Sequence, residues 1–194
     1  MTLPSNIGVI EGFFGRSWSW MERTEYAPFF RDSGYRIYIY APKDDPFLRK
    51  RWREDWPLKT STKLKKLIET YHAEGLKVGV GLSPFELYLN YDVSAKMELR
   101  SKIASLNAIG PDTLCILFDD MRGDVPELAR LQAEITHQIA NISTAGHIIM
   151  CPSYYSFDPI LEKFFGTRPS DYLQDLGRLI ASEIDIFPTI KLVS

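Results

Sequence analysis

The chain has 194 residues, of which 45% are hydrophobic, and a formal net charge of -2. This length is enough for one domain with a sizeable core, spanning residues 1–194. The small net charge provides no strong field to attract nucleic acid or anionic lipid, so we expect neither as a partner. Met1–Asn6 lacks the basic and apolar regions of a signal peptide, and no apolar run reaches the roughly 18 residues of a membrane span. These features predict a cytoplasmic protein.

Short apolar runs, rich in β-branched and aromatic residues, recur along the chain at intervals that leave room for one helix each. They begin at Ile7 (IGVI), Arg36 (RIYIY), Lys77 (KVGVG), Thr113 (TLCILF), His147 (HIIMC) and Ile184 (IDIF). Both faces of these runs look apolar, which is typical of buried parallel strands.

Helical patterns occupy the intervals between these runs, marked by capping residues, apolar stripes and glycine or proline stops. In chain order, the expected helices run from Trp20 to Phe30, from a cap at Thr60 or Ser61 to Gly75, from Ser94 to Ile109, from a cap at Asp124 through Ile139, and from Ser170 to Ala181. Alternating strands and helices predict an α/β fold with a parallel sheet.

Two architectures fit this alternation, an open doubly wound sheet and a (β/α)8 barrel. A dinucleotide-binding fold would carry a G-x-G-x-x-G turn after its first strand, and here only Gly12 and Gly15 stand at that place. A phosphate-binding P-loop is also missing. The nucleotide-binding version of the open sheet is therefore disfavoured.

Polar residues follow several of the predicted strands, at the end where functional residues gather in parallel βα folds. They include Glu11 and Gly12, Lys43 to Asp45, Ser83, Asp119 with Asp120, and Ser153 to Tyr155. Each could simply cap a helix or form a turn. The charged stretch 44–55 (DDPFLRKRWRED) is expected to be a solvated loop.

Asp119 and Asp120 are the most informative of these residues. Adjacent carboxylates repel each other, and burial disfavours the charge of the more buried one, so one becomes a candidate proton donor while the other stays ionised. Glycoside hydrolysis requires two carboxyl roles of this kind. A divalent metal could also use the pair, but no third carboxylate or histidine stands at matching spacing, and we expect no metal and no cofactor.

The two cysteines and three histidines add no further motif. Cys115 and Cys151 lie in apolar runs and are expected to be buried, reduced thiols. His72, His137 and His147 are scattered along the chain.

Four segments of the chain together resemble glycoside hydrolase family 84, which contains the protein O-GlcNAcases and the hyaluronidase-like bacterial N-acetylglucosaminidases. They are GVIEGFFGRSWSW (8–20), YAPKDDPF with RWRE (40–47 and 51–54), LFDD (117–120) and CPSYY (151–155). They occur in the family's order and close to its spacing, and the resemblance extends from Ile7 to Phe187. It implies a partial TIM (β/α)8-type barrel of about six parallel strands with outer helices.

The resemblance also implies a reaction, the removal of N-acetylglucosamine from a glycoprotein or glycan. In that family the substrate's own 2-acetamido oxygen attacks and forms an oxazoline, an exception to the usual carboxylate nucleophile. Asp119 would orient the acetamido N–H, and Asp120 would protonate the leaving oxygen and then activate water. The Gly12 backbone and Lys43 match positions that hold sugar hydroxyls, and Tyr155 matches a tyrosine near the acetamido group.

The chain departs from the family pattern at three places. Phe14 stands where the family often has tyrosine, and Ser17 where it often has proline. After the sixth strand the family continues with Trp-Thr-Gly-Pro, whereas this chain reads FPTIK (187–191) and ends at Ser194.

A (β/α)8 barrel usually needs about 250 residues. The alternatives are therefore an N-acetylglucosaminidase, an inactive truncated homologue that keeps only the fold or weak sugar binding, and an unrelated metal-dependent barrel enzyme. The open edges of an incomplete barrel also lead us to expect self-association.

Overall fold

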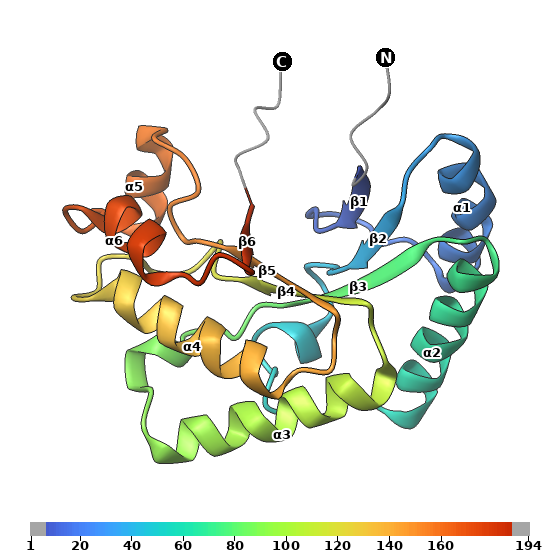
Figure 1. The fold of residues 1–194 in the computed structure, drawn as a ribbon, viewed down its shortest axis with the longest axis horizontal. Coiled ribbons are helices and arrows are strands. Elements are labelled where there is room, and N and C mark those ends of the chain that lie inside the picture. The colour runs from blue at the N-terminus through green and yellow to red at the C-terminus, as the bar shows by residue number, and fades with distance from the viewer. Residues whose placement is uncertain (1–6, 188–194) are drawn as a thin grey trace.

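The computed structural model describes residues 7–187 as one parallel sheet with helices packed against it (Figure 1). The expectations for Met1–Asn6 and for the segment from Pro188 to Ser194 lie outside the described residues. Within residues 7–187, no helix has both the length and the apolar character needed to cross a membrane.

The sheet has six strands, which lie side by side in chain order. They are β1 (Gly8–Glu11), β2 (Ile37–Tyr40), β3 (Lys77–Leu82), β4 (Thr113–Leu117), β5 (His147–Cys151) and β6 (Asp185–Ile186). Every neighbouring pair is parallel. A doubly wound sheet reverses its strand order at a switch point, whereas sequential order is that of a barrel. The expected partial barrel of about six strands is confirmed.

The helices cover the convex side of this curved sheet (Figure 1). They are α1 (Trp20–Asp32), α2 (Leu58–Ala73), α3 (Val93–Ile109), α4 (Leu128–Ile142), α5 (Pro159–Phe165) and α6 (Tyr172–Leu179), with short 3-10 turns η1 (Pro46–Leu48) and η2 (Leu87–Asn90). Alternate strand residues such as Tyr38, Val80 and Ile116 pack against the helices in the main core.

The other strand residues face the concave side, which corresponds to the interior of a barrel. There Ile39, Ala41, Cys115 and Leu117 form a second, smaller apolar cluster. A Cβ at Gly81 would lie 2.6 Å from the Cβ of Ala41, so glycine is needed for this close approach.

Two of the expected helix starts are wrong. α2 begins at Leu58, directly after Pro57, and not at a cap on Thr60 or Ser61. Asp124 does not cap α4, because its carboxylate pairs with Arg122 and the helix begins at Leu128, after Glu127 in the left-handed region. In both places a neighbouring side chain or proline competes with the expected cap.

The expected fifth helix, from Ser170 to Ala181, is shorter than predicted and is preceded by a helix that the sequence pattern does not predict. α6 covers only Tyr172–Leu179. α5 has seven residues, begins with Pro159 and is capped by the Asp158 side chain, which accepts from the Ile160 amide. Seven residues are too few to reveal a helical period, although the Asp-Pro start is a recognisable signal.

Candidate active site

The carboxylate pair lies where β4 ends. The Phe118 amide donates to the Cys151 carbonyl at 2.9 Å and extends the pairing with β5 by one residue. The chain then turns, because Asp120 adopts a left-handed conformation with φ of 58°. Aspartate tolerates this region better than most residues other than glycine. The turn brings two consecutive carboxylates to the same cation.

That cation is Lys43, which follows β2. Its Nζ lies 2.7 Å from Oδ2 of Asp119 and 2.6 Å from Oδ2 of Asp120. The side chains of Lys43, Asp119 and Asp120 are 8%, 19% and 26% exposed. The positive charge lies between the two negative charges in a partly desolvated place, where it offsets their mutual repulsion.

One carboxylate oxygen remains unsatisfied. Among the described residues, Oδ1 of Asp119 is buried and has no hydrogen-bond partner. A buried acceptor of this kind destabilises a folded protein unless a donor reaches it. Oδ1 of Asp119 is therefore an acceptor that no donor among the described residues satisfies.

Most charged side chains of residues 44–55 are exposed, as expected of a solvated loop, but Asp45 and Arg49 are exceptions. Asp45 is buried, and its carboxylate accepts hydrogen bonds from the Tyr40 hydroxyl at 3.0 Å and the Trp56 indole at 2.8 Å. Lys102 of α3 is also buried and donates to the Glu54 carbonyl at 2.9 Å. Burial lowers the pKa of Lys102. Alternating charges suggest solvent exposure, and buried hydrogen-bond partners override that pattern at Asp45.

Arg49, in the same loop, also reaches the carboxylates and was not among the predicted site residues. Its Nη1 lies 3.5 Å from Oδ2 of Asp120, and its side chain is 13% exposed. Nothing in the run RKRWRE distinguishes this arginine from its neighbours. Only the turn of η1 determines which of them points toward the site.

Tyr155 lies beside the pair. It lines a cavity of about 830 Å³ together with Asp120, Phe14 and side chains of α5. Burial raises the pKa of Tyr155, and the negative charges of Asp120 and Asp119 raise it further. The tyrosine is therefore neutral at physiological pH and can donate or accept a hydrogen bond.

Gly12 directly follows β1. It lies at the same end of the sheet as Lys43, which follows the neighbouring parallel strand β2. Within the described residues, no hydrogen bond joins Gly12 to Asp119, so its expected role as a sugar ligand stays a prediction. The preceding residue, Glu11, is 1% exposed and pairs with Arg23 of α1 at 2.7 Å. The Trp18 amide also donates to Glu11, at 3.1 Å, which anchors the loop after β1.

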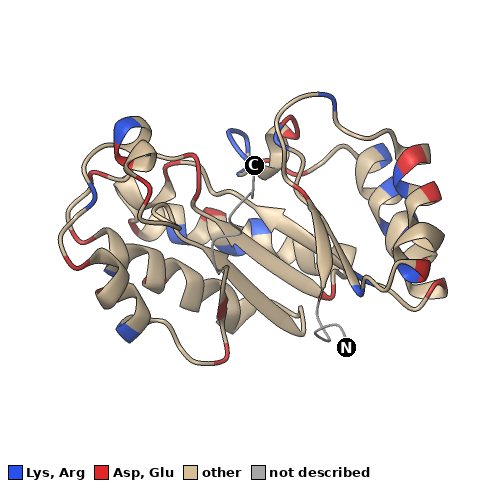
Figure 2. Cartoon of the chain, turned by 90° about the horizontal axis from the view of Figure 1, so that it is seen from above, with Lys and Arg blue, Asp and Glu red and all other residues tan. Residues whose placement is uncertain are grey.

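The remaining expected features have clear positions. Cys115 and Cys151 are free thiols, as predicted, although Cys151 is partly exposed. Burial raises the pKa of both thiols. Within residues 7–187, no three histidine, cysteine, aspartate or glutamate side chains gather as a metal site would require. Acidic and basic residues are interspersed over the helices and loops (Figure 2).

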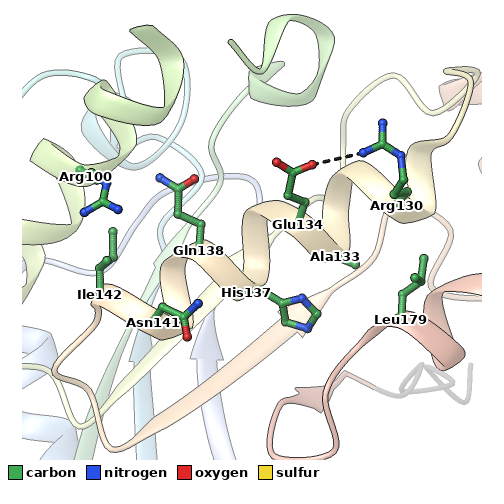
Figure 3. Close-up of a pocket in the computed structure, with 9 residues that line it drawn as sticks. All are labelled: Arg100, Arg130, Ala133, Glu134, His137, Gln138, Asn141, Ile142 and Leu179. Atoms are coloured by element: carbon green, nitrogen blue, oxygen red, sulfur yellow. Dashed lines mark hydrogen bonds and ion pairs between the residues drawn. The ribbon is translucent and has the colours of Figure 1, made fainter. Parts of the chain in front are cut away.

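A second cavity lies on the outer helical layer (Figure 3). It measures about 500 Å³ and is lined by residues of α3, α4 and α6, among them Arg100, His137 and Leu179. The His137 ring accepts a hydrogen bond from the Ala181 amide at 3.2 Å, so its role is to join α4 to the end of α6. This cavity shares no residue with the carboxylate site.

Comparison with known proteins gives one consistent result. A family model described as beta-N-acetylglucosaminidase matches residues 7–193. The protein O-GlcNAcases of Rattus norvegicus and Mus musculus are each 27% identical to this chain over 192 residues. A solved structure of a mutant O-GlcNAc hydrolase from Thermobaculum terrenum is 30% identical, with a TM-score of 0.81.

The matches cover nearly all of this chain but only part of each relative. The alignments take in 94% of this chain and 20% of each rodent protein, and 95% of this chain and 41% of the bacterial structure. The chain thus spans about a fifth of the length of the curated relatives it matches. Since the family model covers almost the whole chain, the protein belongs to the beta-N-acetylglucosaminidase family.

Proposed function

We propose that this chain carries the catalytic pair of a β-N-acetylglucosaminidase that cleaves terminal N-acetylglucosamine by substrate-assisted, retaining catalysis. The observation that carries the proposal is the adjacent pair Asp119 and Asp120, bridged by Lys43, with one Asp119 oxygen buried and unpartnered. A neutral N–H donor from a ligand would satisfy that oxygen without adding a second cation.

Asp119 is the residue that assists the nucleophile. Lys43 occupies its Oδ2, so Oδ1 is the oxygen left for the substrate. A hydrogen bond from the acetamido N–H to Oδ1 would orient the acetamido group and increase the electron density on its carbonyl oxygen. That oxygen then attacks C1 of the sugar and forms the oxazoline as the bond to the leaving oxygen breaks.

Asp120 is the general acid and base. It lines the 830 Å³ cavity, in which the leaving group has room to lie. Asp120 donates a proton to the leaving oxygen and afterwards takes one from the water that opens the oxazoline. Tyr155 lines the same cavity and would hydrogen-bond near the acetamido group, while Lys43 and the Gly12 backbone would hold sugar hydroxyls.

The relatives and the lining of the cavity support the proposed substrate class. The rodent relatives are protein O-GlcNAcases, and the bacterial relative is an O-GlcNAc hydrolase. The cavity beside Asp120 is also lined by apolar side chains from α5, including Ile160 and Phe164. We propose a glycoprotein or glycan bearing terminal N-acetylglucosamine as the substrate, with no cofactor.

The test compares Asp119→Asn and Asp120→Asn in the longest natural polypeptide that contains this chain. Substrates are aryl N-acetyl-β-glucosaminides with good and poor leaving groups, and the matching glucoside without the acetamido group. Asp120→Asn should lose roughly 10²–10⁴-fold on poor leaving groups, which need protonation, and much less on good ones. Asp119→Asn should lose activity on both.

The glucoside should remain uncut, and a thiazoline that mimics the oxazoline should inhibit. Equal losses in both variants across all leaving groups would overturn the assigned roles. Cleavage of the glucoside would overturn the mechanism. An inactive wild-type protein that still binds the thiazoline would favour the alternative of an inactive homologue.

A further inference from the structure

Asp120 has a second cationic neighbour besides Lys43. The guanidinium of Arg49 lies 3.5 Å from its Oδ2, an ion-pair distance, and the Arg49 side chain is only 13% exposed. An exposed arginine in the same loop, Arg51, instead pairs with Glu54 at the surface. Ion pairs add little to stability at the surface, and in a partly desolvated place the loss of hydration offsets much of their attraction. The position of Arg49 beside a single carboxylate oxygen therefore calls for a functional explanation.

The backbone that leads into Arg49 is anchored at two places. Asp45 caps η1 by accepting from the Phe47 amide at 2.9 Å. The Leu48 carbonyl accepts from the Ser83 amide at 2.8 Å, which ties the turn to the end of β3. Leu48 itself is 1% exposed. The Arg49 Cα is therefore fixed relative to the sheet, and its side chain approaches Asp120 from a rigid base.

Both cations contact the same oxygen of Asp120. Within the described part of the chain, the hydrogen bonds and ion pairs of this carboxylate all involve Oδ2, from Lys43 at 2.6 Å and Arg49 at 3.5 Å. Negative charge is stabilised on Oδ2, where two positive groups meet it. A proton on this carboxyl group is accordingly placed on Oδ1, the oxygen without a cation.

Lys43 cannot fix the orientation of Asp120 alone. Its ammonium is shared with Asp119 at nearly equal distance, and it is a point charge on a flexible stem. Arg49 presents a planar, permanently charged group, and its position is further restricted by the Phe14 ring, 5.9 Å from the guanidinium carbon. Arg49 thus restricts the orientation of the Asp120 carboxylate in a way that Lys43 does not.

We propose that Arg49 is a positioning residue for the general acid. By holding Oδ2 of Asp120 it directs Oδ1 toward the leaving group, so proton transfer takes place at Oδ1. In that step the Oδ1–H bond breaks, a bond from hydrogen to the leaving oxygen forms, and the C1–O bond breaks. The negative charge left on Asp120 is received at Oδ2 by Arg49 and Lys43. This inference rests on the function proposed above.

The test is a double-mutant cycle between Arg49→Met and Asp120→Asn, in the same polypeptide and with the same substrates. Arg51→Met is the matched control, because Arg51 lies two residues from Arg49 in the sequence and belongs to an exposed ion pair. If Arg49 acts through Asp120, Arg49→Met should lower kcat on poor leaving groups by about 10- to 100-fold, part of the full general-acid effect. The loss on good leaving groups should be much smaller, and KM should change little.

In the Asp120→Asn background, Arg49→Met should cause less than about a 2-fold further loss, since residues that act as one unit are not additive. Arg51→Met should behave as wild type in both backgrounds. Additive losses, or equal losses on good and poor leaving groups, would overturn the positioning role of Arg49. An unimpaired Asp120→Asn variant would instead overturn the general-acid assignment, so the two failures are distinguishable.

A second measurement does not depend on enzymatic activity. The side-chain NMR signal of the Arg49 guanidinium, recorded on the 194-residue chain, should shift and exchange faster with solvent in Asp120→Asn. It should be unchanged in Glu54→Gln, the variant that removes the partner of Arg51. An Arg49 signal that ignores Asp120→Asn would overturn the contact on which the proposal depends.

Discussion

The buried carboxylate of Glu11 lies beneath the loop after β1, and Glu11→Gln tests how that loop is held. Glu11 is 1% exposed and faces only donors. One oxygen accepts from the Trp18 amide and Arg23 Nη2, and the other from Arg23 Nε and the Tyr38 hydroxyl. Burial, with the charge of Glu11, raises the pKa of Tyr38, so the hydroxyl stays protonated.

The magnitude follows from this geometry. In glutamine an amide NH₂ replaces one of the two carboxylate oxygens, so the donors that contacted that oxygen face another donor. The Arg23 guanidinium, 5% exposed, is also left without a counter-charge. Removing one partner of a buried ion pair costs about 3–5 kcal/mol. With a urea m-value of about 2 kcal/mol per M, the unfolding midpoint should fall by roughly 1.5–2.5 M.

The assay is urea unfolding followed by far-UV circular dichroism, with Glu54→Gln as the matched control. Glu54 pairs with Arg51 at 52% exposure, and water and salt screen that pair, so the control should unfold near the wild-type midpoint. A Glu11→Gln midpoint indistinguishable from the control would refute the reasoning. It would mean that the Arg23 guanidinium finds water or another partner in the folded state.

Two further predictions concern α1 and the sheet edges. The pKa of Glu22 is lowered to about 2, first by the hydrogen bond from the Ser19 amide and then by Arg16. The Glu22 carboxylate should therefore stabilise the folded protein above the ordinary pKa of glutamate, and this stabilisation should be lost as pH falls toward 2. Unfolding measured from pH 7 to pH 2 should show this loss in wild type and not in Glu22→Gln, and parallel pH curves would contradict it. β1 and β6 are the unpaired edges of the described sheet, so sedimentation should detect association of the chain, and a monomer at high concentration would contradict that expectation.

The sheet could be predicted from the sequence because each strand is an uninterrupted apolar run. Residues 113–117 are buried on both faces, and the run TLCIL shows this directly. The expected strand starts agree with the structure to within one residue. Strand order is harder to predict, because periodicity alone does not distinguish a barrel from an open sheet. The resemblance carried by EGF, YAPKDD and FDD decided that question correctly.

Helix starts and loop interiors could not be predicted as well, because they depend on competition between neighbours. Asp124 has the residue type of an N-cap, yet Arg122 two residues earlier takes its carboxylate. Asp45 and Arg49 belong to a stretch whose composition predicts a solvated loop, yet Trp56 and Asp120 draw them inward. Such choices depend on which partner lies across the fold, and a local pattern does not contain that information.

The two departures from the family pattern near the site lie on one loop and contact the same neighbouring loop. Ser17 stands where the family often has proline, and its hydroxyl donates to the carboxylate of Asp44, beside Lys43. Phe14 stands where the family often has tyrosine, and its ring lies 5.6 Å from Lys43 Nζ. A proline would stiffen the loop after β1 through its own backbone. Serine instead ties that loop, through the Asp44 carboxylate, to the loop that carries Lys43.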